Sequence, residues 1–287
     1  MAQIMAAPAA LSARKTDYWA ITVFVLISLV VLIGVPLFGY LYGYTWVDWT
    51  LFGILYVVTG LGITVGYHRM ISHRSFACPD PVKIAFLMAG GWALENSALK
   101  WCSDHVRHHA KVDQEDDPYN AKKGFWYSHL LWIFSKEANA EEKYDKYRAI
   151  FKKDRWIVWQ DRYYLPIVFS GLALPAIIGF FHRGWVGAIS AFLVAGILRT
   201  FVVLNSTFCI NSICHLWGNQ PYGTANSSRD SWLISWITFG EGYHNYHHTY
   251  PKDYRNGPKW YNFDPSKWLI YTLSLLGLAN NLSRNIL

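Results

Sequence analysis

The sequence predicts an all-α membrane protein with four transmembrane helices and a cytoplasmic helical cap that holds a site of nine histidines. Three observations lead to this prediction. Hydrophobic residues make up 53% of the 287-residue chain, which is high for a soluble domain. These residues are concentrated in long blocks with almost no charge. Most histidines stand outside the blocks, in short clusters.

Four blocks are long enough to cross a bilayer, which takes about 20 apolar residues. The first, residues 18–44, carries no charge and is longer than the apolar core of a signal peptide, so we expect a span that is not cleaved. The second covers 49–68. The third and fourth, 163–181 and 185–205, form a second pair, and Arg199 is the only charged residue in the fourth.

The distribution of charge predicts the orientation of these spans. The short turns within the two pairs, near 43–46 and at 182–184, contain one charged residue, Arg183, whereas nearly all other Lys and Arg lie beyond the opposite ends of the spans. The positive-inside rule places that side, with both termini, in the cytoplasm. The net charge of +7 is therefore explained by topology and contact with lipid headgroups, and a nucleic-acid partner is not expected.

Outside the spans, the sequence predicts a simple organisation. Residues 1–17 are expected to form a flexible N-terminal leader, and residues 18–287 a single membrane domain. The cytoplasmic regions are 69–162 and 206–287. Within the first of them, residues 81–98 are apolar but too short for a span, so a helix at the membrane interface is expected.

The motif H-x-x-H-H occurs twice, at residues 105–109 and 244–248. Residues three and four apart share one face of an α-helix. The first and last histidines of each motif can therefore bind one metal ion, as the two histidines of a helical H-E-x-x-H do. The remaining histidines, His108 and His247, are rotated by one residue, and each can reach the ion of the other motif. The spacing predicts two ions held jointly by two helices.

Three further histidines belong with these motifs. His68 and His73 follow the second span, and His215 lies beyond the fourth. Nine imidazoles are too many for one four-coordinate zinc ion, but they suit two ions of higher coordination, and a redox pair of this kind favours iron. His129 and His182 fit neither cluster, and we interpret them as packing or surface residues.

Taken together, the motifs resemble those of the integral-membrane Δ9 fatty-acyl desaturases, which include the animal stearoyl-CoA desaturases and bacterial relatives. The resemblance runs from about residue 50 to residue 263 and rests on "HRMISH", "DHVRHH", "DPYNAKKGFWYSH", "NSICH" and "GEGYHNYHH". It implies a cytoplasmic cap with a di-iron centre, O2 as co-substrate, and insertion of a cis double bond, most typically Δ9, into a saturated C16 or C18 acyl chain.

The resemblance also implies how the ligands divide between two iron ions. One ion would have five histidine ligands, and the other would have four together with an asparagine that binds through water. Carried onto this chain, the first set is His68, His73, His105, His109 and His247, and the second is His108, His215, His244, His248 and Asn211.

The same resemblance indicates residues for the substrate. Asn96 and Lys136 match positions near the acyl-carrier end, but Ser103 stands where the animal enzymes tend to have an arginine. Asp104, which precedes the first H-x-x-H-H, would orient a metal ligand or contact the substrate; the alternative is a helix cap or a surface carboxylate. The carrier therefore stays open between CoA, a membrane lipid and acyl carrier protein. The electron donor, a ferredoxin or a b-type cytochrome with its reductase, is expected to be a separate protein.

The second span suggests where the acyl chain ends. Counting back in fours from His68 gives Thr64, Gly60 and Tyr56, which lie near one helix face. Gly60 leaves room for a chain and Tyr56 can close the end, so these two residues are predicted to form the floor of a tunnel. The alternative is ordinary packing between spans, with Gly60 at a close helix contact.

Two kinds of alternative function remain. A di-iron fatty-acid hydroxylase or an alkene-forming decarboxylase would use the same scaffold, although "DPYN" and "NSICH" favour a desaturase. A membrane haem protein or a metal carrier would place histidines or ionisable groups inside the spans. Here the histidine clusters lie outside the apolar blocks, which disfavours this second class.

Overall fold

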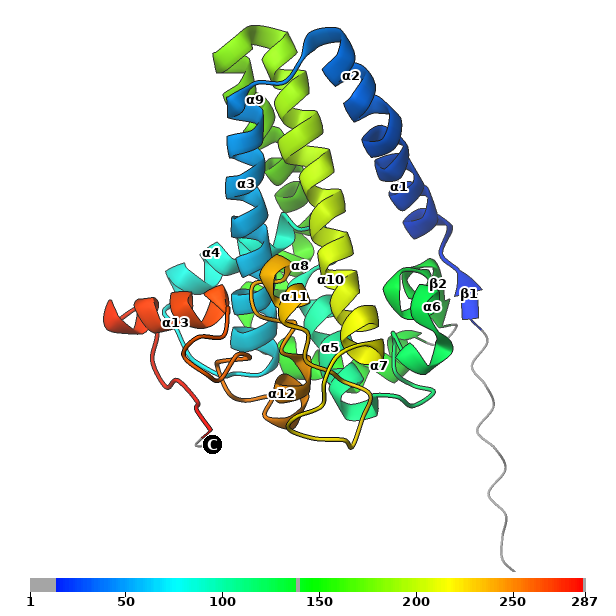
Figure 1. The fold of residues 1–287 in the computed structure, drawn as a ribbon, viewed down its shortest axis with the longest axis vertical. Helices are drawn as coiled ribbons and strands as arrows, with labels where there is room; N and C mark the ends of the chain where they lie inside the picture. Colours follow the sequence, from blue (N-terminus) through cyan, green and yellow to red (C-terminus); the bar gives the residue numbers. More distant parts are fainter. Residues whose placement is uncertain (1–13, 138–139, 286–287) are drawn as a thin grey trace, which may run out of the picture.

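A layer of long apolar helices stands on a layer of shorter helices and loops (Figure 1). The computed structural model describes residues 14–137 and 140–285. The long helices are α1 (Tyr18–Leu29), α2 (Val35–Tyr42), α3 (Trp46–Leu61), α9 (Tyr164–Ala191) and α10 (Arg199–Leu216), joined by the π-helical segments η1 (Val30–Gly34), η2 (Gly62–Ser72) and η5 (Phe192–Leu198). The shorter α-helices are α4 (Asp80–Gly91), α5 (Ala98–Lys111), α6 (Phe125–His129), α7 (Ala140–Phe151), α8 (Arg155–Arg162), α11 (Trp232–Ile237), α12 (His244–Thr249) and α13 (Pro265–Leu275). The 3₁₀ turns η3 (Ala121–Lys123) and η4 (Leu131–Phe134) complete the helical elements.

Three continuous helical runs are long and apolar enough to cross a membrane: Tyr18–Tyr42, Trp46–Ser72 and Tyr164–Leu216. The third, 53 residues long, has non-helical backbone at Arg183 and Gly184. The chain reverses there, and the segments before and after the turn pack closely. A Cβ on Gly179 would lie only 2.2 Å from the carbonyl oxygen of Gly187. This run therefore contains both the third and the fourth predicted blocks. The second and third runs continue past the predicted ends at residues 68 and 205, which carries histidines out of the apolar layer on the same helices.

Local capping explains where the first helices begin. The Asp17 side chain accepts a hydrogen bond from the backbone N–H of Ala20 at the start of α1. At the start of α3, Thr45 and Asp48 form a capping box, in which Asp48 accepts from the backbone N–H of Thr45 at 2.7 Å. Such caps satisfy N–H groups that the first helical turn leaves free. Both helices are thus fixed at one end by their own sequence.

A small sheet is the one departure from the all-helical prediction in the described part of the chain. Strand β1 (Arg14–Thr16) pairs in antiparallel fashion with β2 (Ser135–Glu137). Three residues of the expected leader are therefore ordered, while residues 1–13 lie outside the described residues. The sheet fixes the start of α1 beside η4, and the backbone N–H of Asp17 donates to the carbonyl of Phe134 at 2.8 Å.

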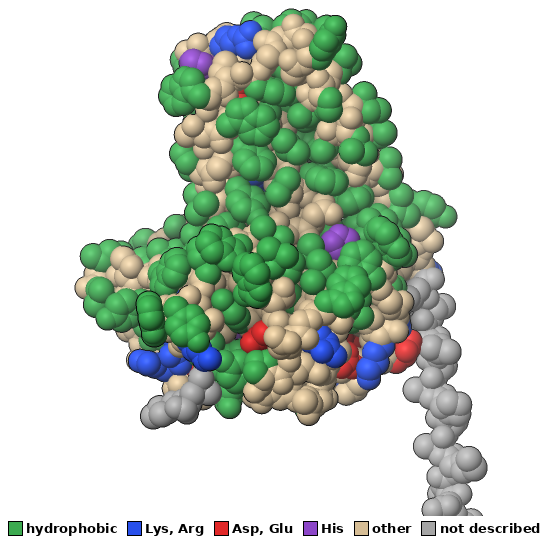
Figure 2. All heavy atoms as spheres, viewed as in Figure 1, with side chains coloured by type: hydrophobic (Ala, Val, Ile, Leu, Met, Phe, Trp, Pro, Cys, Tyr) green, Lys and Arg blue, Asp and Glu red, His purple; other side chains and the backbone are tan. Residues whose placement is uncertain are grey.

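The surface is divided in the same way as the helices (Figure 2). Hydrophobic side chains cover the upper layer, where Tyr40 and Phe181 are 87% and 83% exposed. Arg183 is the basic residue at the upper end, whereas other Lys and Arg gather along the lower face. Apolar residues exposed on long helices with charge beyond their ends are typical of lipid-facing surfaces.

Candidate metal centre

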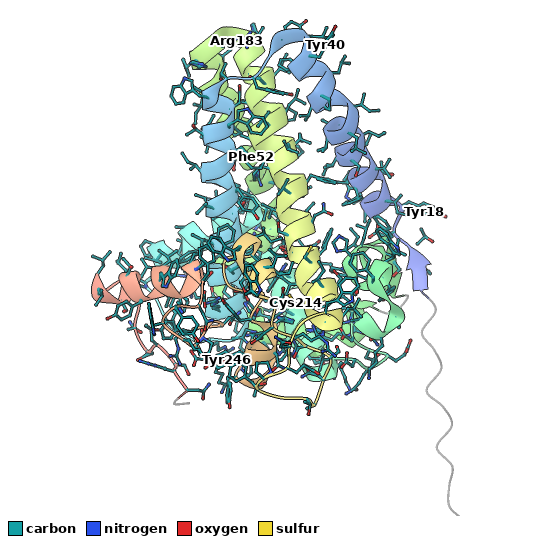
Figure 3. The ribbon with its side chains drawn as sticks, in the orientation of Figure 1. Tyr18, Tyr40, Phe52, Arg183, Cys214 and Tyr246 are labelled. Atoms are coloured by element: carbon teal, nitrogen blue, oxygen red, sulfur yellow. The ribbon has the colours of Figure 1, made fainter. Side chains whose placement is uncertain are left out.

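The nine histidines of the sequence motifs come together in the lower layer. They form one group of five and one group of four, and within each group the candidate ligand atoms all lie within 4.8 Å of one another. Cys214 and Tyr246, labelled in Figure 3, mark the end of α10 and the middle of α12, two helices that together carry four of these histidines. The first group is His68, His73, His105, His109 and His247, and the second is His108, His215, His244 and His248. This is the division that the spacing and the resemblance predict; the binding of metal by these groups stays a prediction.

The Nε2 atoms of each group point toward a common centre. In the first group, His68 and His247 have Nε2 atoms 3.0 Å apart, and His109 and His247 have them 2.9 Å apart. In the second, the Nε2 atoms of His244 lie 3.0 Å from those of both His215 and His248. Two nitrogens bound side by side to one metal ion, each at about 2.1 Å, would stand about 3.0 Å apart. The observed spacing therefore fits neighbouring ligands of one ion.

A π-helix brings His68 and His73 into the same group. Residues five apart point about 140° away from each other on an α-helix, which turns 100° per residue. Along η2, however, the chain follows i→i+5 bonding, and the backbone N–H of His73 donates to the carbonyl of His68 at 3.1 Å. Their rings lie 4.8 Å apart. π-Helical turns are often found at functional sites for this reason.

Polar contacts on the far side of three rings orient them: those of His108 and His215 are hydrogen bonds, whereas His68 Nδ1 meets Glu241 at close range but outside hydrogen-bond geometry. His68 Nδ1 lies 2.8 Å from Glu241 Oε2, and His108 Nδ1 lies 2.8 Å from Asp117 Oδ1. His215 Nδ1 donates to the Ser227 hydroxyl at 2.8 Å. A proton on Nδ1 leaves the Nε2 lone pair free for the centre of the group, as in metal-binding histidines whose second nitrogen meets a carboxylate.

The environment keeps most of these imidazoles neutral. Among the histidines that lie beyond the three long helical runs, burial lowers the pKa of six well below its usual value, and the neighbouring histidines lower it further. These six are His73, His105, His109, His244, His247 and His248. Neutral imidazole is the form that binds metal, so the cluster has the protonation state that a metal centre requires.

Glu241 joins the centre to the surrounding structure. Its Oε1 accepts from Arg69 Nε at 3.1 Å, and its Oε2 accepts from the Asn256 side-chain amide at 2.5 Å, beside the contact to His68. Burial alone would raise the pKa of Glu241, but its contacts with His68 and Arg69 hold it below its usual value. Glu241 is therefore a carboxylate, suited to hold the His68 Nδ1–H. Glu241 lies three residues before His244 in the loop that precedes α12, where no metal-ligand spacing indicates its role.

A second buried carboxyl group supports the other side of the first group. The Trp101 indole stacks on His105, with the ring centroids 5.0 Å apart. Its Nε1–H donates to Glu95 Oε2 at 3.0 Å, and the Thr207 hydroxyl lies 2.7 Å from Glu95 Oε1. Burial raises the pKa of Glu95 to about 7. Neither Glu95 nor Trp101 has a metal-ligand motif that a sequence search would detect.

The donor set matches a pair of metal ions that prefer nitrogen ligands. Both groups consist of histidines alone among the described residues, with carboxylates behind them. Imidazole suits iron, zinc, copper and nickel, whereas magnesium and calcium prefer oxygen ligands. Five nitrogen donors exceed the four ligands of a structural zinc site, so the first group fits an ion of higher coordination, while the second group offers four donors.

A cavity of about 950 Å³ connects the histidines with the apolar layer. His68, His105, His108 and His244 line it at one end. Its other walls come from α1, α3, α9 and α10. A deep pocket with mostly apolar walls that ends at a few polar groups is the usual form of a site for an apolar ligand.

The expected tunnel floor does lie on this cavity. Tyr56 and Gly60 both line it. The Tyr56 hydroxyl donates to the carbonyl of Ile237 at 2.6 Å. A Cβ added to Gly60 would come 2.1 Å from the ring of Phe239, which lines the same cavity. Gly60 is thus at a close contact as well as on the wall, and Phe239 is a wall residue that the sequence did not indicate.

The remaining predicted residues lie around the cavity. Asn211, Asn96 and Asp104 line it. Asp104 Oδ2 accepts from Lys100 Nζ at 2.8 Å, while its buried Oδ1 has no hydrogen-bond partner. Lys136 lies on β2 opposite Lys15, and its side chain is outside the described part of the structure.

His129 and His182 stand apart from both groups. His129 Nδ1 lies 3.0 Å from the Ser212 hydroxyl, and its ring stacks on Phe125. The ring of His182 lies 6.3 Å from that of Trp46 at the opposite end of the long helices. These contacts agree with the interpretation of both as packing or surface residues.

Comparison with known proteins adds independent evidence. The family model for "Fatty acid desaturase" matches residues 44–269. "Acyl-CoA desaturase 1" of Saccharomyces cerevisiae is 38% identical over 269 residues, which cover 90% of this chain and 51% of the yeast protein. "sn-2 palmitoyl-lipid 9-desaturase" of Nostoc is 36% identical over 240 residues, 81% of each chain, and "Stearoyl-CoA desaturase 5" of Bos taurus is 35% identical over 80% of this chain and 69% of the bovine protein. The chain spans about half the length of the two yeast relatives that it matches.

Proposed function

The chain belongs to the fatty acid desaturase family of membrane proteins, and on this premise we propose that it inserts a cis double bond at the Δ9 position of a saturated C16 or C18 acyl chain. The observation that carries the proposal is the pair of histidine groups, with most of their imidazoles neutral, on the wall of a cavity with a mostly apolar lining. An alkyl C–H is not acidic, so acid–base side chains alone cannot remove its hydrogen. A protein that acts on one therefore has to bind a stronger reagent and position the chain against it.

Two iron ions are the proposed cofactor, with O2 as co-substrate. When bound, they would supply the oxidising power needed to remove two hydrogens from adjacent methylenes. The group of five would hold one ion, and the group of four, with Asn211 through a water molecule, would hold the other. Asp117 and Ser227 hydrogen-bond the Nδ1 atoms of His108 and His215, and Glu241 lies 2.8 Å from that of His68, so that the Nε2 lone pairs of these three histidines would face the ions.

The cavity would act as the ruler for the double bond. An acyl chain that lies along it passes the four histidines at its wall, with Tyr56, Gly60 and Phe239 in the apolar part beyond. Each methylene that moves from water into the cavity contributes about 0.8 kcal/mol to the binding free energy. The acyl chain is therefore expected to enter until the wall blocks it. A fixed depth then presents one pair of methylenes to the histidine end.

The arrangement in the membrane follows from the same layers. We propose four spans, the third helical run being two spans joined at Arg183–Gly184, with both termini and the metal centre in the cytoplasm. Electrons would come from a separate donor protein, a ferredoxin or a b-type cytochrome with its reductase. Asn96, Asp104 and Lys136 would bind the carrier end of the substrate, which is CoA, a lipid or acyl carrier protein.

The first test is expression in a host that lacks its own desaturase and supplies an electron donor. We expect a new cis-9 monoene in the total fatty acids, located by gas chromatography–mass spectrometry after derivatisation. His105→Ala, which removes one ligand of the first group, should abolish it. His129→Ala is the matched control, because this histidine lies outside both groups, and it should retain the product.

Two other results would change the assignment. A hydroxy acid or a terminal alkene that depends on His105 would keep the metal centre but replace the desaturase by a hydroxylase or a decarboxylase. An equal yield of the monoene from wild type and His105→Ala would contradict the role of the histidine groups.

A further inference from the structure

The cavity reaches the side of the molecule that faces the bilayer. Trp19 and Leu26 on α1 and Leu165 and Phe169 on α9 all line it. These four side chains are nevertheless 71%, 57%, 56% and 64% exposed. Residues that line a cavity and are mostly exposed mark its opening. The cavity is therefore open between α1 and α9, on the surface of two candidate membrane spans.

The packing of α1 explains this opening. Its Phe24 ring contacts Phe134 of η4 and, on α10, Phe201 and Phe208, at ring-centroid distances of 5.8, 6.1 and 6.5 Å. These contacts hold α1 against η4 and α10, so α10 forms the floor behind the opening. In Figure 1, α1 leans away from the other long helices toward its lower end. The result is an elongated slot with apolar sides.

Polar groups surround the end of the slot next to the lower layer. Asn96, Lys100, Arg148 and Tyr164 line the cavity there. The Tyr164 hydroxyl accepts from the backbone N–H of Asn96 at 3.0 Å, which joins α9 to the loop before α5. Amide, ammonium and guanidinium groups donate hydrogen bonds to ester and phosphate oxygens. Apolar sides with a polar, partly cationic end match the layout of a lipid, whose tails lie in the bilayer and whose headgroup lies at its surface.

We infer that the chain takes its substrate from the bilayer as an acyl chain of a membrane phospholipid, which enters sideways through the slot between α1 and α9. This inference rests on the proposed function, because it assumes that the cavity holds the acyl chain. An acyl chain linked to CoA or acyl carrier protein has a free methyl end, and this end can enter a tunnel first from water. One tail of a two-tailed lipid cannot be threaded in that way while the other stays in the bilayer, so a lateral slot is the opening that it needs.

The test uses binding rather than turnover, so that it does not depend on the reaction. The full chain is placed in nanodiscs with a phosphatidylcholine that carries a mid-chain diazirine on one acyl tail, or is mixed with stearoyl-CoA that carries the same group. After illumination, mass spectrometry locates the labelled peptides. We expect the phospholipid to label the cavity wall around Tyr56–Thr64, and to do so more than the CoA ester.

Two variants narrow the slot from opposite sides: Leu26→Trp on α1 and Leu165→Trp on α9. Each should lower cavity labelling by the phospholipid about tenfold, which corresponds to about 1.4 kcal/mol of binding. Leu29→Trp and Ile177→Trp are the matched controls, since both residues are exposed on the same helices and do not line the cavity. In these two variants the phospholipid should label the cavity as strongly as in the wild type. All four positions are exposed, so the variants are expected to fold.

The inference is overturned if stearoyl-CoA labels the cavity and the phospholipid does not, or if neither does. It is also overturned if both slot variants label as strongly as their controls. Analysis of fatty acids in the same nanodiscs, with a reducing system added, reports the proposed function separately. Phospholipid labelling in the cavity without any new double bond would keep the lateral entry and reject the desaturase activity.

Discussion

Three side chains behind the histidines decide which nitrogen faces the centre. Glu241, Asp117 and Ser227 hold the Nδ1 atoms of His68, His108 and His215, each at 2.8 Å. Asp117 also accepts from the backbone N–H groups of Asp113 and Tyr119. The loop that follows α5 therefore fixes Asp117, and Asp117 in turn orients His108.

Asp117→Asn should weaken iron binding by about 10–100-fold, the usual cost of losing a partner behind a metal-binding histidine. The amide lacks the charge that favours the Nδ1–H form of His108, and one of its two terminal atoms can no longer accept the backbone hydrogen bonds. Iron per chain and competition with a chelator would measure the effect. Glu115→Gln is the control, because Glu115 is an exposed neighbour that pairs with Lys123. Equal iron affinity in the two variants would contradict the role of Asp117.

The buried carboxyl group of Glu95 should make stability depend on pH. Its pKa is about 7 in the folded protein, whereas the ordinary value is 4.5. A folded-state pKa above the unfolded one means that the folded state binds more protons between these two values. Stability should therefore be fully present below pH 4.5, fall as the pH rises through about 7, and level off above it.

Glu95→Gln removes this titration while it keeps a hydrogen-bond acceptor for Trp101. The difference between pKa values of 4.5 and about 7 corresponds to about 3 kcal/mol. We expect the variant to unfold at a higher temperature than the wild type at pH 8 and at nearly the same temperature at pH 4.5. Thermal unfolding in detergent, followed by tryptophan fluorescence, would measure this. A constant difference between the two proteins at every pH would rule out a titration of Glu95.

At the scale of elements, the helix on which a histidine lies determines how well the sequence predicts its place. The i,i+4 histidine pairs of α5 and α12 follow directly from α-helical geometry. His68 and His73 do not, because their five-residue spacing needs the π-helix of η2, and nothing in the sequence separates a π-helix from an α-helix there. Glu95 and Phe239 were missed for another reason: each acts through tertiary contacts to Trp101 or Gly60, and such contacts leave no periodic pattern.

Helix α3 offers a matched pair of glycines for testing the acyl ruler. Gly60→Leu would place its side chain against Phe239, since even a Cβ would lie 2.1 Å from that ring. The wall should move into the cavity, and the products should shift from C18 toward C16 and shorter chains. Gly53→Leu is the control on the same helix, because nothing lies within 4 Å of a Cβ there. Fatty-acid profiles of both variants would be compared, and an unchanged profile for Gly60→Leu would reject the ruler.

At the scale of the whole molecule, hydropathy predicts the two layers, because long apolar blocks have few other stable environments. It does not predict where the helices end. The η2 and α10 helices continue to Ser72 and Leu216 although their hydropathy has already fallen. There they are stabilised by packing in the lower layer and not by contact with lipid. The slot beside α1 was also not foreseen, because it depends on the angle between helices and not on the composition of either one.

Labelling of single cysteines would test the proposed orientation. Trp185→Cys lies near the turn at Arg183–Gly184, and Trp260→Cys lies in the lower layer; the two tryptophans are 75% and 88% exposed. A maleimide that does not cross membranes should label the first in intact cells and the second only after lysis, if the basic end is cytoplasmic. The wild-type chain, with its four cysteines buried or half-buried, gives the background. The opposite order of labelling would invert the topology.

The run from Trp46 to Ser72 has a mechanical consequence. It is one continuous helical run of 27 residues, α-helical to Leu61 and π-helical from Gly62 to Ser72. It starts at the end of the molecule away from the histidines, crosses the apolar layer and ends beside His73. Where hydrocarbon thickness differs between membranes, helices adjust mainly by tilting or by deforming the lipid around them. Hydrophobic mismatch would therefore rotate or displace this helical run as a unit, and the separation of His68 and His73 at its lower end would stay the same in thin and thick bilayers.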